Sequence, residues 1–224
     1  MRNLEHAAAI TLAAVALVMG CGGGASGARP DDMSASAHER ASQAEQAAAQ
    51  RAAAEYDPHD TAVLVTPTPH NQAELDGVPH ERTFNPTAEH RDEAAEHRAH
   101  AAQHEAAADS LRHFEAVECR AFPPETRAAC PLLSGVTEVV NIAGGVRMHF
   151  APDAPADAVL ARIRCHLAYA RTRAYAAVSS CPLYVRGVDA RAGAGGTIEL
   201  TAADAATVQL IRDETRMQTG TDTP

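Results

Sequence analysis

The sequence predicts an α+β fold, in which a small antiparallel sheet and two helices follow one another in the order ββαββα at the C-terminus. The first observation is the distribution of large apolar side chains. Residues 132–218 contain 21 Leu, Ile, Val and Phe, whereas residues 22–131 contain 10. Folding must offset about 1–2 kcal/mol of backbone entropy for each ordered residue, so only the C-terminal segment can form a core. We therefore expect Ala/His-rich helices and a disordered tether in front of this segment.

A repeated pattern is the second observation. Twice in the C-terminal segment an Ala-Gly-Gly sequence separates two strand-like runs, and a helix follows. A Gly-Gly turn between alternating runs is typical of a β-hairpin. The expected elements are strands at 137–142 and 146–150 with a helix from Pro155, then strands at 184–192 and 197–201 with a helix from about Ala202. The apolar positions after the glycines differ by one residue between the two units. One antiparallel sheet with both helices on one face would bury these side chains.

The N-terminus carries an apolar run from Ala7 to Met19 that is followed by Gly20 and Cys21. The run is too short to span a bilayer as a helix and is typical of the core of a signal peptide. A small residue followed by Cys at its end resembles the lipobox of bacterial lipoproteins, and the resemblance covers residues 1–21. It implies that a signal peptidase cuts before Cys21 and that this residue is acylated. The Gly that follows, in place of Asp, implies delivery to the outer membrane.

The chain divides into six expected segments. They are a lipoprotein signal peptide at 1–20, a lipid-anchored flexible tether and Ala-rich helix at 21–56, a Pro-rich linker at 57–85, a His-rich helix at 86–118, a Cys-bounded loop at 119–131 and an α+β domain at 132–218. The Ala-rich helix has almost nothing large to bury, so we expect it to be solvated. The linker contains one strand-like patch at 61–66. The His-rich helix is expected to start with Asn85 as its N-cap and Pro86 as its first residue.

Four cysteines follow Cys21, and they are Cys119, Cys130, Cys165 and Cys181. An even number in an exported chain favours disulfides, with three possible pairings. The short loop between Cys119 and Cys130 favours their local pairing, which leaves Cys165 for Cys181. In the chain-entropy model a loop of about 15 residues contributes roughly 3 kcal/mol. A metal or redox site built from cysteines is the alternative, although the chain contains no Cys-x-x-Cys.

Histidine is the one unusual residue type, with 12 in the chain. Four ligand-type residues of the His-rich helix share one face, at helical spacing: Glu93, His97, His100 and His104. Imidazoles three or four positions apart on a helix can share a Zn²⁺, Cu²⁺ or Ni²⁺ ion, and a carboxylate can complete the ligand set. The same face continues to Leu111, so the alternative is that these histidines pack against a neighbour or face solvent. We refer to these four residues as the histidine stripe.

Catalytic signals are weak. Cys165 and His166 are adjacent, but neighbours on a helix point about 100° apart and do not face each other. The helical pattern places Cys165 opposite the apolar stripe and His166 at its margin, as a surface residue. The chain has no Gly-x-Ser-x-Gly, no His-Glu-x-x-His and no phosphate loop. We therefore expect a protein that is not an enzyme, and a thiol enzyme is a distant alternative.

The net charge of −10 argues against nucleic acid as a partner. The function that the sequence favours is a binding or structural module of the bacterial cell envelope, held to the outer membrane by its lipid and facing the periplasm. The alternative is a metal-binding or metal-buffering lipoprotein that uses the histidine stripe. No cofactor is expected apart from the Zn or Cu of that alternative.

Overall fold

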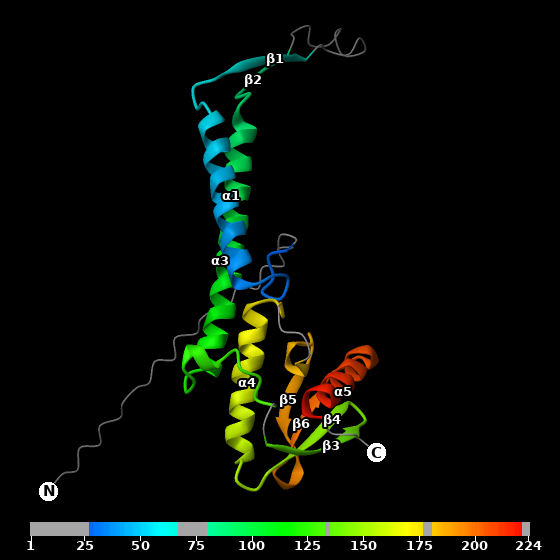
Figure 1. Ribbon diagram of the computed structural model, residues 1–224. Coiled ribbons are helices and arrows are strands. Elements are labelled where there is room, and N and C mark those ends of the chain that lie inside the picture. Colours follow the sequence, from blue (N-terminus) through cyan, green and yellow to red (C-terminus); the bar gives the residue numbers. More distant parts are fainter. Residues whose placement is uncertain (1–26, 67–79, 133–134, 177–180, 221–224) are drawn as a thin grey trace, which may run out of the picture.

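The computed structural model describes residues 27–66, 80–132, 135–176 and 181–220, so the signal sequence and Cys21 lie outside the described residues. It has the α+β fold that the sequence predicts (Figure 1). A C-terminal domain contains a four-stranded antiparallel sheet and two helices, and a long helical hairpin stands out from it. In this described part of the chain, no helix is long and apolar enough to cross a membrane.

The C-terminal domain has the predicted ββαββα order. Its elements are β3 (Val136–Ile142), β4 (Gly145–Phe150), α4 (Ala156–Thr172), β5 (Asp189–Ala192), β6 (Ile198–Thr201) and α5 (Ala205–Thr219). The strands lie in the spatial order β3-β4-β6-β5, and all neighbours are antiparallel. Since β4 and β6 are neighbours at the centre of the sheet, the two hairpin-plus-helix units share one core.

The one-residue offset between the units follows from their different turns. A two-residue turn joins β3 to β4, whereas a longer loop with a short 3₁₀ turn at Ala194–Gly196 joins β5 to β6. Gly145 begins β4 against the backbone of β6, and a Cβ atom at Gly145 would collide with the carbonyl group of Leu200. This register pairs Val146 with Leu200 and Met148 with Ile198.

Both helices cover one face of the sheet. On that face the side chains of Val146, Met148, Ile198 and Leu200 are fully buried, and they form one core with residues of α4 and α5. The strand expected at 184–192 was too long, because Pro182–Tyr184 form a 3₁₀ turn and β5 starts at Asp189. The core is thus built by the two repeated units that the sequence pattern predicts.

The other face of the sheet carries a row of charges. Arg147, Glu199 and Arg191 lie opposite one another on β4, β6 and β5. Arg147 donates to Oε1 of Glu199 at 2.7 and 3.0 Å, and Arg191 donates to Oε2 at 2.8 and 2.9 Å. These bonds lower the pKa of Glu199. The three side chains tie three adjacent strands together across the solvent side.

The helical hairpin consists of α1 (Ala35–Glu55) and α3 (Ala88–Glu118), which run antiparallel (Figure 1). At its far end β1 (Ala62–Thr66) and β2 (His80–Phe84) form a two-stranded antiparallel ribbon. The contact between the helices is made mainly by small side chains, which are Ala49, Ala52, Ala94, Ala101, Ala107 and Ala108, together with Ser42. Alanine lets two helices approach closely, so α1 is packed along its length and is not the solvated helix expected from the sequence.

The start of α3 differs from the expectation by two residues. Thr87 is the N-cap residue, and α3 runs from Ala88 to Glu118. The side-chain oxygen of Asn85 accepts hydrogen bonds from the backbone nitrogen and the hydroxyl of Thr87, at 2.8 and 2.7 Å. Asn85 therefore shapes the turn before the helix, and the end of the helix agrees with the prediction.

Candidate metal centre

Helix α4 is buried on two sides, which the sequence did not indicate. Its apolar stripe faces the sheet, and the end of α3 packs on the opposite side. Thr172 of α4 donates to the backbone oxygen of Leu111 of α3 at 3.3 Å. Cys165 and His166 are only 2% and 1% exposed. The expectation that His166 is a surface residue is therefore wrong, because α3 covers that side of α4.

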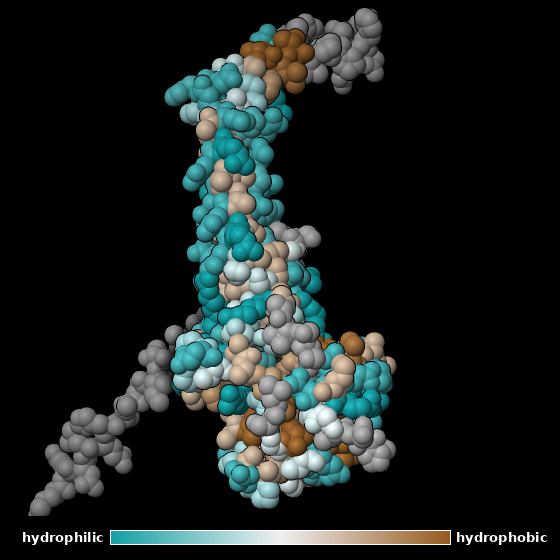
Figure 2. All heavy atoms as spheres, viewed as in Figure 1, coloured by the Kyte–Doolittle hydropathy of each residue, from teal (hydrophilic) through white to brown (hydrophobic). Residues whose placement is uncertain are grey.

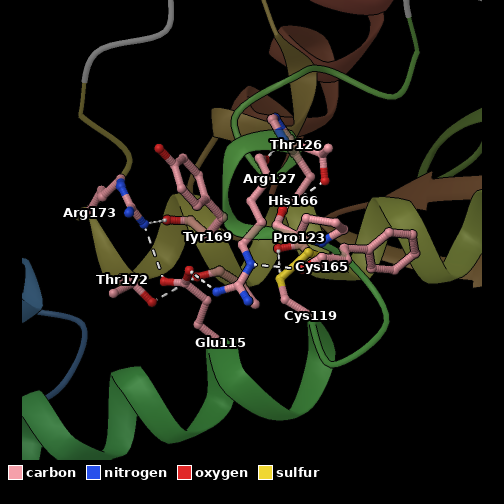
Figure 3. The surroundings of a disulfide bond; sticks show 12 residues. Glu115, Cys119, Pro123, Thr126, Arg127, Cys165, His166, Tyr169, Thr172 and Arg173 are labelled. Carbon is pink, nitrogen blue, oxygen red and sulfur yellow. Dashed lines mark hydrogen bonds and ion pairs between the residues drawn. A yellow bond between two sulfur atoms is a disulfide. The ribbon is translucent and has the colours of Figure 1, made fainter.

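A disulfide joins Cys119, at the C-terminal end of α3, to Cys165 of α4 (Figure 3). The expected pairing of Cys119 with Cys130 and of Cys165 with Cys181 is therefore wrong. The chain after Cys119 leads Cys130 away from α3 and toward Cys181 instead. Cys130 and Cys181 are not bonded to each other in this structure, and their sulfur atoms lie 2.8 Å apart. Since Cys165 is in the disulfide, it is not a free nucleophile.

A buried carboxylate fixes the loop after the disulfide. Glu115 of α3 accepts hydrogen bonds from Arg127 of that loop at 3.0 Å and from Arg173 at 3.2 Å, as Figure 3 shows. With Arg127 held in this way, its backbone oxygen accepts a hydrogen bond from Nδ1 of His166 at 2.8 Å. A carbonyl oxygen can only accept, so Nδ1 carries the proton and Nε2 of the neutral ring keeps its lone pair.

The free nitrogen of His166 faces the two cysteines that are not in the disulfide. Nε2 of His166 lies 3.7 Å from Sγ of Cys181, and the donor atoms of Cys130, His166 and Cys181 all lie within 4.8 Å of one another. We refer to these three residues as the Cys₂His group. They come from the loop after α3, from α4 and from the start of the 3₁₀ turn at Pro182–Tyr184. Three distant parts of the chain therefore bring a possible metal-binding group together.

The surroundings of the Cys₂His group favour a neutral histidine and shift the pKa values of the two thiols in opposite directions. Burial lowers the pKa of His166, against the opposing effect of the Arg127 carbonyl. The hydrogen bond between the two thiols lowers the pKa of Cys130 and raises that of Cys181, which burial raises further. Cys130 is therefore the first of the two thiols to lose its proton. It is also half-buried, whereas Cys181 is 3% exposed.

Two sulfur ligands and one imidazole nitrogen suit soft and borderline ions such as Cu⁺ and Zn²⁺. A carbonyl that accepts from the second ring nitrogen is the usual support for a metal-binding histidine. Two thiolates on a tetrahedral zinc ion lie about 3.8 Å apart, given zinc–sulfur bonds of about 2.3 Å. The sulfur atoms of Cys130 and Cys181 would thus separate by about 1 Å on binding. Since Cys130 lies in a loop, the chain can accommodate that movement.

The histidine stripe faces α1 and does not form a second group of this kind. His97 Nδ1 lies 2.6 Å from Glu45 Oε2, and His104 Nδ1 lies 3.1 Å from His38 Nδ1. His97 and His104 are seven residues apart, which is about 10 Å along a helix, so they meet different partners. In the described part of the chain, the Cys₂His group is where three or more ligand-type residues converge. The signal that sequence reasoning missed is the matching seven-residue spacing of His38 and Glu45 on α1.

The remaining stripe residues stay at the edge of the hairpin. Glu93 lies 3.5 Å from His90 and 3.8 Å from His97, and His100 is half-buried between the helices and solvent. The stripe therefore contributes polar contacts between α1 and α3, together with the alanine packing.

A cavity of about 430 Å³ lies where the hairpin meets the domain. Arginines and aromatic rings line it, but two of its arginines are already bonded to the chain's own Asp31. Arg171 donates to both carboxylate oxygens of Asp31 at 2.6 and 2.9 Å, and Arg186 donates to the Asp31 backbone oxygen at 2.6 Å. These contacts lower the pKa of Asp31 and fasten the segment before α1 to the domain.

Comparison of the chain with protein family models, with curated proteins and with solved structures finds no match.

Proposed function

We propose that the protein is a lipid-anchored component of the bacterial cell envelope that binds Cu⁺ or Zn²⁺ through Cys130, His166 and Cys181. The observation that carries the proposal is the convergence of these three donor atoms, with the lone pair of His166 Nε2 turned toward Cys181. The proposal keeps the metal-binding function that the sequence offered as an alternative, but it moves the ligands from the histidine stripe to the C-terminal domain. It assigns a binding role and no catalytic step.

The location in the cell rests on the first residues of the chain. The apolar run that leads to Gly20 and Cys21 supports acylation of Cys21 and attachment to the outer membrane, on its periplasmic side. In cells, Cys21→Ser should leave unprocessed precursor and abolish partitioning of the mature protein into detergent. A serine variant that still matures and partitions like the wild type would refute the anchor.

Metal titration of the reduced full chain tests the binding proposal. With a chromophoric chelator as competitor, the wild type should bind one Zn²⁺ or Cu⁺ ion. His166→Ala and Cys130→Ala should each weaken binding about 10-fold or more, since each removes one of three ligands. Cys130 is half-buried, so its variant is expected to fold even where the histidine variant does not.

The matched control is the double variant His100→Ala and His104→Ala. It removes two residues of the histidine stripe and leaves the Cys₂His group intact, so it should bind metal like the wild type. Unchanged binding by Cys130→Ala, or loss of binding in the control alone, would overturn the assignment and return the metal to the stripe.

A structural or binding role without metal is the second candidate, and the helical hairpin favours it. Helix α3 has 31 residues and is therefore about 46 Å long, so the hairpin holds its ribbon far from the domain. Figure 2 shows apolar side chains at the ribbon end, where Val63, Leu64 and Val65 are 58%, 53% and 53% exposed. A photo-crosslinking residue at position 64 should give a discrete adduct in cells, and one at the exposed position 105 of α3 should not. Equal labelling at both positions would count against this role.

A further inference from the structure

The two cysteines of the Cys₂His group lie almost close enough to bond. Their sulfur atoms, from positions 51 residues apart in the sequence, are 2.8 Å from each other. A disulfide bond is about 2.05 Å long, and two thiolates on one zinc ion are about 3.8 Å apart. The distance between the sulfur atoms of Cys130 and Cys181 is therefore intermediate between that of a disulfide and that of two thiolates on one metal ion. A movement of about 1 Å or less leads to either state.

The two thiols differ in access. Cys130 is half-buried in a loop, whereas Cys181 is 3% exposed behind it. The disulfide between Cys119 and Cys165 is fully enclosed, with exposures of 0% and 2%. A disulfide that approaches from solvent can therefore reach Cys130 before any other of these four cysteines. Exchange depends on which sulfur can be attacked as well as on its reactivity.

We propose that Cys130 and Cys181 form a redox-active dithiol, which exchanges with low-molecular-weight disulfides, and that its oxidised form does not bind metal. The Cys130 thiolate attacks one sulfur of a disulfide RSSR, forms a mixed disulfide and expels one RS⁻. The Cys181 thiolate then attacks the Cys130 sulfur and expels the second RS⁻. The protein loses two electrons, RSSR gains them, and the two thiol protons end on two molecules of RSH.

The link to metal follows from the ligand count, and this part of the inference rests on the proposed metal function. A bond between Cys130 and Cys181 uses both sulfur ligands and leaves His166 as the remaining donor. A single imidazole binds Zn²⁺ or Cu⁺ weakly, so oxidation should release the ion and reduction should restore the site.

Trapping with oxidised glutathione tests the exchange step, in the full chain with Cys21→Ser so that the remaining four cysteines are the only ones present. With Cys181→Ser added, the attack by Cys130 cannot be resolved, and a glutathione adduct should accumulate at Cys130. With Cys130→Ser added instead, buried Cys181 should react on the order of tenfold or more slowly. Faster or equal labelling of Cys181 would overturn the assigned order, and absence of labelling at Cys130 would overturn the exchange activity.

Parallel measurements of metal and thiols in the Cys21→Ser chain separate this inference from the proposed function. The reduced chain should bind one ion, and the glutathione-oxidised chain, with Cys130 mapped to Cys181, should bind none. If the reduced chain binds no metal but Cys130 is trapped, the metal function fails and the exchange activity stands. If metal is bound and Cys130 and Cys181 do not oxidise, or if the oxidised chain binds metal equally well, the redox inference fails and the metal function stands.

Discussion

Replacement of Cys119 and Cys165 by alanine tests how firmly the hairpin is joined to the domain. The bond closes a loop with a sequence separation of 46 residues. In the chain-entropy model, a loop of this length contributes about 4 kcal/mol to the free energy of unfolding at 25 °C. For a chain of this size that loss corresponds to a fall in Tm of about 8–16 °C. Alanine suits both positions, because the two side chains are buried and no charge is introduced.

Urea denaturation of the full chain, followed by circular dichroism, measures this loss directly. Cys130→Ala is the matched control, because Cys130 lies outside this disulfide, and it should change the free energy of unfolding by less than the double variant does. A loss below about 1 kcal/mol in the double variant would show that the bond does not restrain the unfolded chain as calculated. Peptide mapping that finds Cys119 joined to Cys130 would refute the pairing itself.

Three further substitutions test the core, the sheet surface and the hairpin. Ile163→Ala removes a fully buried side chain of α4 and should cost about 2–5 kcal/mol in urea denaturation. The lowered pKa of Glu199 means that its ion pairs stabilise the fold at neutral pH and are lost as the pH falls below about 4.3, so Glu199→Gln should flatten that acid dependence. Burial and nearby His38 lower the pKa of His104, against a smaller opposite effect of Glu45. Folding therefore opposes protonation of His104, and stability should fall as the pH drops below about 6.5. His104→Ala should reduce this slope, measured as the urea midpoint at pH 7.5 and 5.5, and an unchanged slope would contradict the role of His104.

The C-terminal fold could be predicted because local signals agree with the tertiary structure there. The Ala-Gly-Gly turns, the alternating side chains of β4 and β6 and the apolar stripe of α4 each specify the same packing. The hairpin could be predicted only in part, since Ala contributes to helix propensity whether or not a partner helix covers it. The packing role of α1 depends on its partner α3, against which Ala49 and Ala52 are buried.

The candidate site was missed because it depends on contacts between distant residues. Sequence spacing favours a local bond from Cys119 to Cys130, but the packing of α3 on α4 brings Cys165 to Cys119 instead. The same packing buries His166, which the helical pattern placed at a surface margin. No spacing rule joins Cys130, His166 and Cys181, since they come from three separate elements. Because the end of α3 covers one side of α4, the folded C-terminal unit includes that end of α3.

The order of the cysteines has a consequence for how the protein is made. Cys119 pairs with Cys165 and not with Cys130, although Cys130 comes earlier in the chain than Cys165. If the chain is exported as we propose, Cys119 and Cys130 reach the oxidising compartment before Cys165 does. Oxidation in order of arrival would then join Cys119 to Cys130, and exchange would have to correct that bond before α3 docks on α4. On the proposed export route, this pairing would therefore depend on disulfide exchange as well as on an oxidant.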